Sequence, residues 1–186
     1  MTSAVRSEAD VLVAVQDAVL KAPADRTVLA TARGLSHFGE HALGWFALAG
    51  TGAAVAAVRG RKDTAGATAG VAPWVELGVS AFTAHAASVV LKRVVRRRRP
   101  SDPRIRVGVA TPSRLSFPSS HATSTAAALT SLTRVTGSRL LLAGVPVMMA
   151  SRLVLGVHYP TDVLAGVALG VATEKAVHRT AKEINR

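Results

Sequence analysis

The sequence contains no cysteine and few aromatic residues. Without cysteine, neither a disulfide framework nor a thiolate metal site is possible, and cysteine usage gives no indication of the redox compartment. Only 4% of the residues are aromatic although 49% are hydrophobic, so the apolar content consists mainly of Ala, Val and Leu, accompanied by 15 Gly. Small residues in long uncharged stretches are typical of closely packed membrane helices rather than of a soluble core.

Acidic residues are also scarce, since 11 Asp and Glu stand against 23 Lys and Arg. The net charge is +12 and the mean hydropathy is +0.31, a combination that is ordinary for a small membrane protein with basic loops. Residues 42–58 carry no charge, and residues 64–91 carry one acidic residue over a length that can cross about 30 Å of hydrocarbon. The basic loop lacks the interleaved aromatics of a nucleic-acid site, so we expect phosphate or anionic lipid partners and no nucleic acid.

The hydropathy pattern predicts one all-α domain, residues 1–186, folded as a polytopic transmembrane helical bundle in the cell membrane. About five spans are expected, over residues 41–58, 70–95, 118–137, 140–155 and 160–177. Ser and Thr are frequent in the third span, whereas Glu174 and Lys175 shorten the fifth and begin a charged tail. Lys and Arg are divided almost evenly between the two membrane faces, so they do not predict which face is cytoplasmic.

Residues 1–38 are predicted to form an N-terminal amphipathic or interfacial region. A helix there would place Val11, Val15, Ala18 and Val19 on one face, either on the membrane surface or against the bundle.

The glycines of the fifth span form a small-xxx-small pattern. Gly166 and Gly170 would let this helix approach a neighbour closely. An Ala- and Gly-rich sequence also produces such patterns by chance, so both interpretations stay open.

Ionisable residues gather at the ends of four of the expected spans. The clusters are Lys92 with Arg99, then Ser119, Ser120 and His121, then Arg152, and then His158 with Asp162. Because successive spans alternate in direction, all four clusters reach the same membrane face. Ionisable groups close to hydrocarbon are rare unless they are paired, hydrated or functional, so the pattern indicates one active site at the membrane surface.

Two of these clusters suggest chemistry by themselves. Pro118 followed by serines is a favourable helix start, where hydroxyls and free backbone N–H groups bind anions. If Asp162 begins a helix, its carboxylate can reach one ring nitrogen of His158 and raise the basicity of the other. A neutral imidazole held in this way is a good nucleophile toward phosphorus, although a structural His–Asp pair fits the same residues.

The remaining arginines of the basic run, Arg93, Arg96, Arg97 and Arg98, are interpreted as a solvated basic face or a membrane anchor.

Taken together, the motifs resemble the three-part signature of the type 2 phosphatidic acid phosphatase superfamily over residues 91–162. The matching segments are Lys92-x6-Arg99-Pro100, Pro118-Ser-x-His121 and Ser151-Arg152-x5-His158-x3-Asp162. Their order, their spacing and the membrane helices between them all agree with the family. One departure is Ser120, where the family usually has Gly. Serine keeps the backbone N–H that faces phosphate, so activity should survive.

The resemblance implies an integral membrane lipid phosphatase that works without a metal or other cofactor. It implies that His158 attacks phosphorus to form a phosphohistidine, that Asp162 stabilises the imidazolium, and that His121 acts as acid and then base. Lys92, Arg99, Ser119, Ser120 and Arg152 would bind the phosphate. A metal site is disfavoured because His121, His158 and Asp162 would converge among at least three cations.

The substrate and the surroundings of the site are less defined by the motifs. Similarity to small actinobacterial members of the family implies a polyprenyl-type lipid, decaprenylphosphoryl 5-phosphoribose, used in cell-wall arabinan synthesis. Undecaprenyl diphosphate, phosphatidic acid and phosphatidylglycerol phosphate are the alternatives, and a catalytically silent anionic-lipid-binding protein is the non-enzymatic one. His37 and His41, beside Glu40, are interpreted as packing residues, with contact to a substrate headgroup as the alternative. The oligomeric state is not predicted.

Overall fold

The computed structural model describes residues 3–21, 25–60 and 67–184, which form helices and loops without a regular strand. The helices are α1 (Ser3–Leu20), α2 (Asp25–Phe38), α3 (Leu43–Gly60), α4 (Ala67–Val95), α5 (Ser120–Thr136), α6 (Gly144–Val154) and α7 (Pro160–Ile184). Two short 3-10 turns, η1 (Glu40–Ala42) and η2 (Arg139–Ala143), precede α3 and α6. The predicted all-α class is confirmed for this part of the chain.

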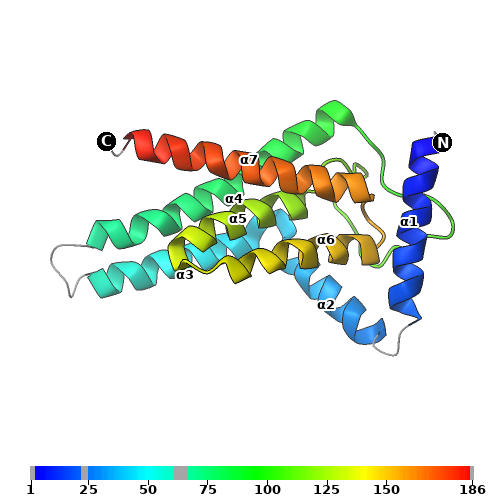
Figure 1. Ribbon diagram of the computed structural model, residues 1–186, viewed down its shortest axis with the longest axis horizontal. Coiled ribbons are helices and arrows are strands. Elements are labelled where there is room, and N and C mark those ends of the chain that lie inside the picture. The colour runs from blue at the N-terminus through cyan, green and yellow to red at the C-terminus, as the bar shows by residue number, and fades with distance from the viewer. Residues whose placement is uncertain (1–2, 22–24, 61–66, 185–186) are drawn as a thin grey trace.

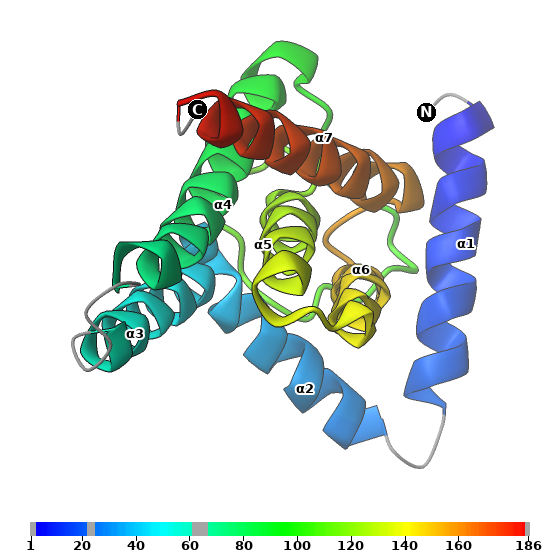
Figure 2. The same ribbon diagram turned by 60° about the vertical axis from the view of Figure 1, so that its left-hand side comes forward.

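Helix α5 lies at the centre of the bundle. Figure 2 shows α4, α6 and α7 around it, whereas α3 lies on the outer side of α4. In Figure 1 these helices run roughly along the long axis, and α1 crosses one end of the bundle, opposite the C-terminus. The long connection 96–119 and the short loop 155–159 lie at the same end as α1.

The hydroxyls of α5 explain how a helix of low hydropathy becomes the core. Thr123, Ser124 and Thr130 donate to the backbone carbonyls of Ser119, Ser120 and Ala126 within the same helix. A buried hydroxyl without a hydrogen bond is unfavourable, and these internal bonds remove that penalty.

Close contact between α5 and α7 depends on the two glycines of the small-xxx-small pattern. A Cβ atom on Gly166 would lie 2.8 Å from the backbone oxygen of Ser119, and one on Gly170 would lie 2.2 Å from that of Thr123. The interpretation as a helix contact is therefore correct, because no larger side chain fits at either position.

Helix α7 continues beyond the predicted end of the fifth span, and the expected charged tail is wrong only where two of its residues pack, since Lys175, Arg179, Lys182 and Glu183 are exposed. Glu174 is fully buried and pairs with Arg134 of α5, and His178 Nδ1 lies 2.7 Å from Glu76 Oε1 of α4. These partners, more than 25 residues away in sequence, let charged residues pack where local hydropathy predicts an exposed tail.

The N-terminal region consists of two helices, and of the two placements expected for the apolar face of α1, packing against the bundle is wrong. Ala9, Leu12 and Gln16 are buried, whereas Val11 is 48% exposed. The predicted face, with Val11 and Ala18 exposed and Val15 and Val19 half-buried, is thus directed mainly away from the bundle.

The Gln16 side chain joins α1 to the long connection and to the end of α6. Its Oε1 accepts the backbone N–H of Arg106, while its Nε2 donates to the backbone oxygens of Arg106 and Val154. Arg33 of α2 also donates to the backbone oxygen of Gly108. The connection 96–119 is therefore held by hydrogen bonds from both N-terminal helices.

Within residues 3–21, 25–60 and 67–184, two helical stretches, Asp25–Gly60 and Gly70–Val95, are long and apolar enough to cross a membrane. Large apolar side chains also lie exposed on several helices. They include Val55 and Val58 on α3, Val75, Val79, Phe82 and Val90 on α4, Val147 on α6 and Leu164 on α7.

Candidate active site

A cavity of about 550 Å³ opens at the end of the bundle where the long connection and the 155–159 loop meet. Six of the eight residues predicted for the site line it: Lys92, Arg99, Ser120, His121, Arg152 and His158. They come from the end of α4, the connection, the start of α5, the end of α6 and the loop before α7. The other two, Ser119 and Asp162, are fully buried behind the wall of the cavity.

His158 is buried and faces Arg99. Arg99 Nη1 lies 3.2 Å from His158 Nε2, and the same guanidinium donates to the backbone oxygens of Val157 and Ser113. Since a guanidinium only donates, Nε2 of His158 is the acceptor and its proton is on Nδ1. Burial first, and then the positive charge of Arg99, holds the pKa of His158 well below its usual value of 6.5, so the ring is neutral at pH 7. Burial also lowers the pKa of Arg99 to about 10.

Asp162 lies on the other side of the His158 ring, where its two carboxylate oxygens have different partners. Oδ2 accepts the backbone N–H of Tyr159 at 2.8 Å and lies 3.6 Å from His158 Nδ1. This separation is an ion-pair distance rather than a hydrogen bond, and catalytic hydrogen bonds are often long before substrate binds. Oδ1 accepts a hydrogen bond from Arg97 Nη1 at 3.0 Å.

Arg97 is the residue of the site that sequence reasoning missed, and its interpretation as a solvated arginine is wrong. Its guanidinium lies 4.3 Å above the Tyr159 ring and pairs with Glu8 of α1 at 3.1 Å as well as with Asp162. Thr161 lies in the same network, 2.6 Å from Arg97 Nη1. No spacing along the chain signals this contact, because Glu8 lies 89 residues away.

His121 is oriented by the end of α2. Its Nε2 lies 2.9 Å from the backbone oxygen of Ser36, and since a carbonyl only accepts, Nε2 carries a proton. Nδ1 is therefore the nitrogen that is free to exchange a proton. Gly39 lies directly against the ring, because a Cβ atom there would be 2.6 Å from His121 Cδ2.

Arg152 is a buried cation that pairs with no carboxylate in the described part of the chain. The residue is 1% exposed, and its Nε and Nη1 have no hydrogen-bond partner among the residues that the structure describes. Lys92, by contrast, donates to the backbone oxygens of Ser116 and Pro118. A buried charge left unpaired is strongly unfavourable, so this guanidinium indicates a site for an anionic ligand.

The two serines at the start of α5 have different positions. Ser119 is the N-cap of the helix, and its hydroxyl accepts the backbone N–H of Ala122 rather than facing the cavity. Ser120 lines the cavity, and its hydroxyl lies 2.8 Å from that of Ser88 on α4. The hydroxyl at the position where the family usually has Gly is thus accommodated by a polar neighbour.

In the described part of the chain, no group of three or more His, Asp and Glu side chains has the arrangement needed to hold a metal ion.

Comparisons with known proteins identify the family of this chain. The family model described as PAP2 superfamily matches residues 73–186. Decaprenylphosphoryl-5-phosphoribose phosphatase of Mycobacterium tuberculosis H37Rv is 53% identical over 165 residues, covering 89% of this chain and 85% of the relative. The phosphatase of the same name from Mycolicibacterium smegmatis is 54% identical over 166 residues, covering 89% of this chain and 84% of the relative.

A solved structure shares the fold. The transmembrane PAP2 type phosphatidylglycerolphosphate phosphatase from Bacillus subtilis superposes with a TM-score of 0.65 at 24% identity, covering 100% of this chain and 90% of that one. The resemblance inferred from the three motifs is confirmed, and the chain belongs to the PAP2 superfamily.

Proposed function

We propose that this protein is an integral membrane lipid phosphatase that removes the terminal phosphate of decaprenylphosphoryl 5-phosphoribose, a precursor of cell-wall arabinan. The single observation that carries the phosphatase assignment is the unpaired, buried guanidinium of Arg152 in a cavity that also holds Lys92 and Arg99. The substrate is assigned from the mycobacterial relatives, whose names specify it and which match most of this chain.

The phosphate of the substrate binds among Lys92, Arg99 and Arg152. The planar guanidinium of Arg152 donates to two phosphate oxygens at once, and backbone N–H groups at the start of α5 add further donors. When Arg99 turns toward the phosphate, it leaves His158 Nε2, and the lone pair of that nitrogen becomes available. Substrate binding thereby prepares the nucleophile.

The first chemical step is an in-line attack of His158 Nε2 on phosphorus. The bond between phosphorus and the ester oxygen breaks, and a phosphohistidine forms. Asp162 stabilises the positive charge on the ring through Nδ1–H, while the three cations stabilise the negative charge of the transition state. His121, protonated on Nδ1, donates its proton to the departing oxygen.

The second step releases phosphate. His121, now neutral, takes a proton from a water molecule that attacks the phosphohistidine, so the phosphorus–nitrogen bond breaks and His158 is restored. Each proton that His121 gives in the first step returns to it in the second, and the cycle needs no metal.

The membrane placement that we propose has about five spans, with α1 lying at the interface. The exposed valines and Phe82 of α3 and α4 support contact with lipid, because such apolar surfaces are unusual on soluble monomers. The cavity then lies at headgroup level, where a lipid phosphate reaches it while its chain stays in the bilayer.

Phosphate release from a panel of lipids tests this function. The full chain, purified in detergent, is assayed with decaprenylphosphoryl 5-phosphoribose, undecaprenyl diphosphate, phosphatidic acid and phosphatidylglycerol phosphate, beside His158→Ala. We expect the pentose lipid to be preferred and the variant to release at least about 1,000-fold less phosphate. Equal release by the two proteins contradicts the enzyme assignment, and a preference for another lipid contradicts the substrate.

A chelator tests the metal-free mechanism. We expect EDTA to leave the rate unchanged, since the charges at the phosphate come from Lys92, Arg99 and Arg152. A loss of activity that an added divalent ion restores contradicts this expectation.

A further inference from the structure

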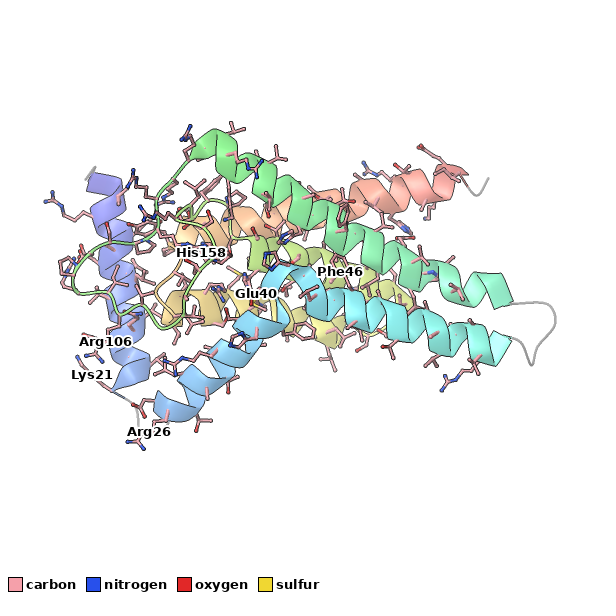
Figure 3. All side chains as sticks on the ribbon, turned by 180° about the vertical axis from the view of Figure 1, so that it is seen from behind. Lys21, Arg26, Glu40, Phe46, Arg106 and His158 are labelled. Atoms are coloured by element: carbon pink, nitrogen blue, oxygen red, sulfur yellow. The ribbon has the colours of Figure 1, made fainter. Side chains whose placement is uncertain are left out.

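The cavity extends well beyond the cationic cluster. Its volume of about 550 Å³ is typical of sites for whole small molecules, which range over roughly 300–1,000 Å³. Another part of its wall is formed by His37, Glu40, His41 and His85, which we call the polar corner. Figure 3 shows Glu40 at the bend between α2 and α3, and the same cavity is lined by the labelled His158.

The backbone of this bend holds side chains of the polar corner in an unusual geometry. His41 has a φ of 51° and Ala42 a φ of 60°, in the left-handed region that is unfavourable for residues other than glycine. Ala42 is fully buried in the core that includes Trp45 and Leu77, and this packing holds the strained turn in place. Backbone strain of this kind is concentrated at ligand and catalytic sites.

Polar groups of the corner have hydrogen-bonding capacity that the described residues do not use. His37 Nδ1 lies 3.9 Å from Glu40 Oε2, which is too long for a hydrogen bond. His85 Nδ1 is buried and has no partner in the part of the chain that the structure describes. The rings of His41 and His85 lie with their centroids 6.1 Å apart. His37 and His41 are both exposed, so their interpretation as packing residues is wrong.

The charge of Glu40 restricts what the polar corner binds. A carboxylate repels a second phosphate, so the part of a ligand beside it is uncharged and donates hydrogen bonds. A carboxylate accepts from two neighbouring hydroxyls at once, and histidine side chains also form hydrogen bonds with hydroxyls. A metal ion is a poor alternative, because the described residues include no metal-binding arrangement of these side chains.

We propose that the polar corner binds the hydroxyls of the sugar that carries the scissile phosphate, with Glu40 as the principal acceptor. This subsite rests on the proposed function, and it explains how a lipid phosphatase distinguishes a phosphorylated pentose from a phosphate attached directly to a lipid. The cations bind the phosphate, and the polar corner binds the sugar to which the phosphate is attached.

The test is a ratio of two activities of the full chain in detergent. For each protein, kcat/KM is measured with decaprenylphosphoryl 5-phosphoribose and with decaprenyl monophosphate, which lacks the sugar. The activity ratio is kcat/KM for the sugar-containing lipid divided by kcat/KM for decaprenyl monophosphate. We expect this ratio to fall roughly 10- to 100-fold in Glu40→Ala, because hydrogen bonds to a charged group are lost, and to fall less in Glu40→Gln. Asp17→Asn, which removes the carboxylate of an exposed ion pair on α1, should leave the ratio unchanged.

Soluble inhibitors give a second measurement that does not depend on lipid. The wild type should bind ribose 5-phosphate more tightly than inorganic phosphate, and Glu40→Ala should lose this preference. An unchanged activity ratio in Glu40→Ala, or a wild type that binds the two inhibitors equally, overturns the subsite while the phosphatase assignment stands. A wild type that cleaves neither lipid overturns the proposed function and the subsite with it.

Discussion

Arg97 Nη1 lies 3.0 Å from Asp162 Oδ1, so the carboxylate beside His158 is held by a cation from the long connection. The same guanidinium is tied to α1 through Glu8 and stacks on Tyr159. Arg97 thus acts on the nucleophile through Asp162, as a positioning residue.

Replacing Arg97 should therefore lower kcat more than it raises KM. In Arg97→Gln the Asp162 carboxylate loses its charged donor, and we expect kcat to fall about 10- to 100-fold, the effect of one charge-assisted hydrogen bond. Arg97→Lys should recover part of the loss, because it restores the charge. The exposed Arg98 provides the matched control, and Arg98→Gln should behave as wild type in steady-state assays. An equal loss in both glutamine variants contradicts a specific role for Arg97.

Gly39 should be essential because of its contact with His121. In Gly39→Ala the new Cβ would lie 2.6 Å from Cδ2 of the ring, so His121 must move and its bond to the Ser36 oxygen is lost. We expect kcat to fall on the order of 100-fold, within the range of general acid–base catalysis. Gly34→Ala, within α2, is the control, since a Cβ there meets nothing within 4 Å. Similar rates for the two variants would count against the positioning of His121 by the bend.

The pH dependence of the reaction should report the charge of Arg99. Its positive charge is one of the causes that lower the pKa of His158, so Arg99→Gln should raise that pKa toward 6.5. Because the nucleophile must be neutral, activity is lost as the pH falls through this pKa, and the acid limb of kcat/KM should move to higher pH. Profiles of kcat/KM over pH 4–8 check this shift; an acid limb that does not move in the variant contradicts the coupling.

The contact between α5 and α7 should tolerate no side chain at Gly170. Gly170→Ala places a Cβ 2.2 Å from the Thr123 oxygen, so the helices must separate, and we expect a loss of about 1–3 kcal/mol in stability. Gly50→Ala on α3 is the control, because a Cβ there is in open space and Ala favours a helix. Thermal unfolding in detergent should show a lower midpoint for Gly170→Ala only. Equal unfolding midpoints would mean that α7 shifts to accommodate the new methyl group without loss of stability, and would contradict the prediction.

The sequence predicted the residues around the cavity better than the contacts behind it. His121, Arg152 and His158 follow from residue type and spacing, since helix ends at one face of a bundle must meet there. In the expected His158–Asp162 pair, His158 Nδ1 lies 3.6 Å from Asp162 Oδ2, because Asp162 also accepts hydrogen bonds from the Tyr159 backbone and from Arg97. Ser119 was expected to face the phosphate, but in the structure it caps α5.

Long-range partners account for most of what the sequence could not predict. Arg97 looks like its exposed neighbour Arg98, and only the fold brings Glu8 to it. Glu174 likewise indicates the end of a span when the sequence is considered alone, whereas in the fold it pairs with Arg134. The hydropathy of one segment contains no information about a counter-charge in another, so such residues are assigned to the surface.

The hydrogen bonds of the Gln16 amide restrict which segments of this chain can be replaced by those of a homologue. One side chain uses its acceptor and both donor hydrogens on backbone groups of residues 106 and 154, so it depends on the backbone path of the long connection and of the end of α6 rather than on their sequences. Substitutions of side chains in these segments are compatible with Gln16 as long as that path is kept. An insertion near residue 106, or an α1 grafted from a homologue with a different residue at position 16, breaks the match even if every catalytic residue is retained. Helix α1 and the long connection therefore depend on each other and should be exchanged together when chimeric enzymes are made.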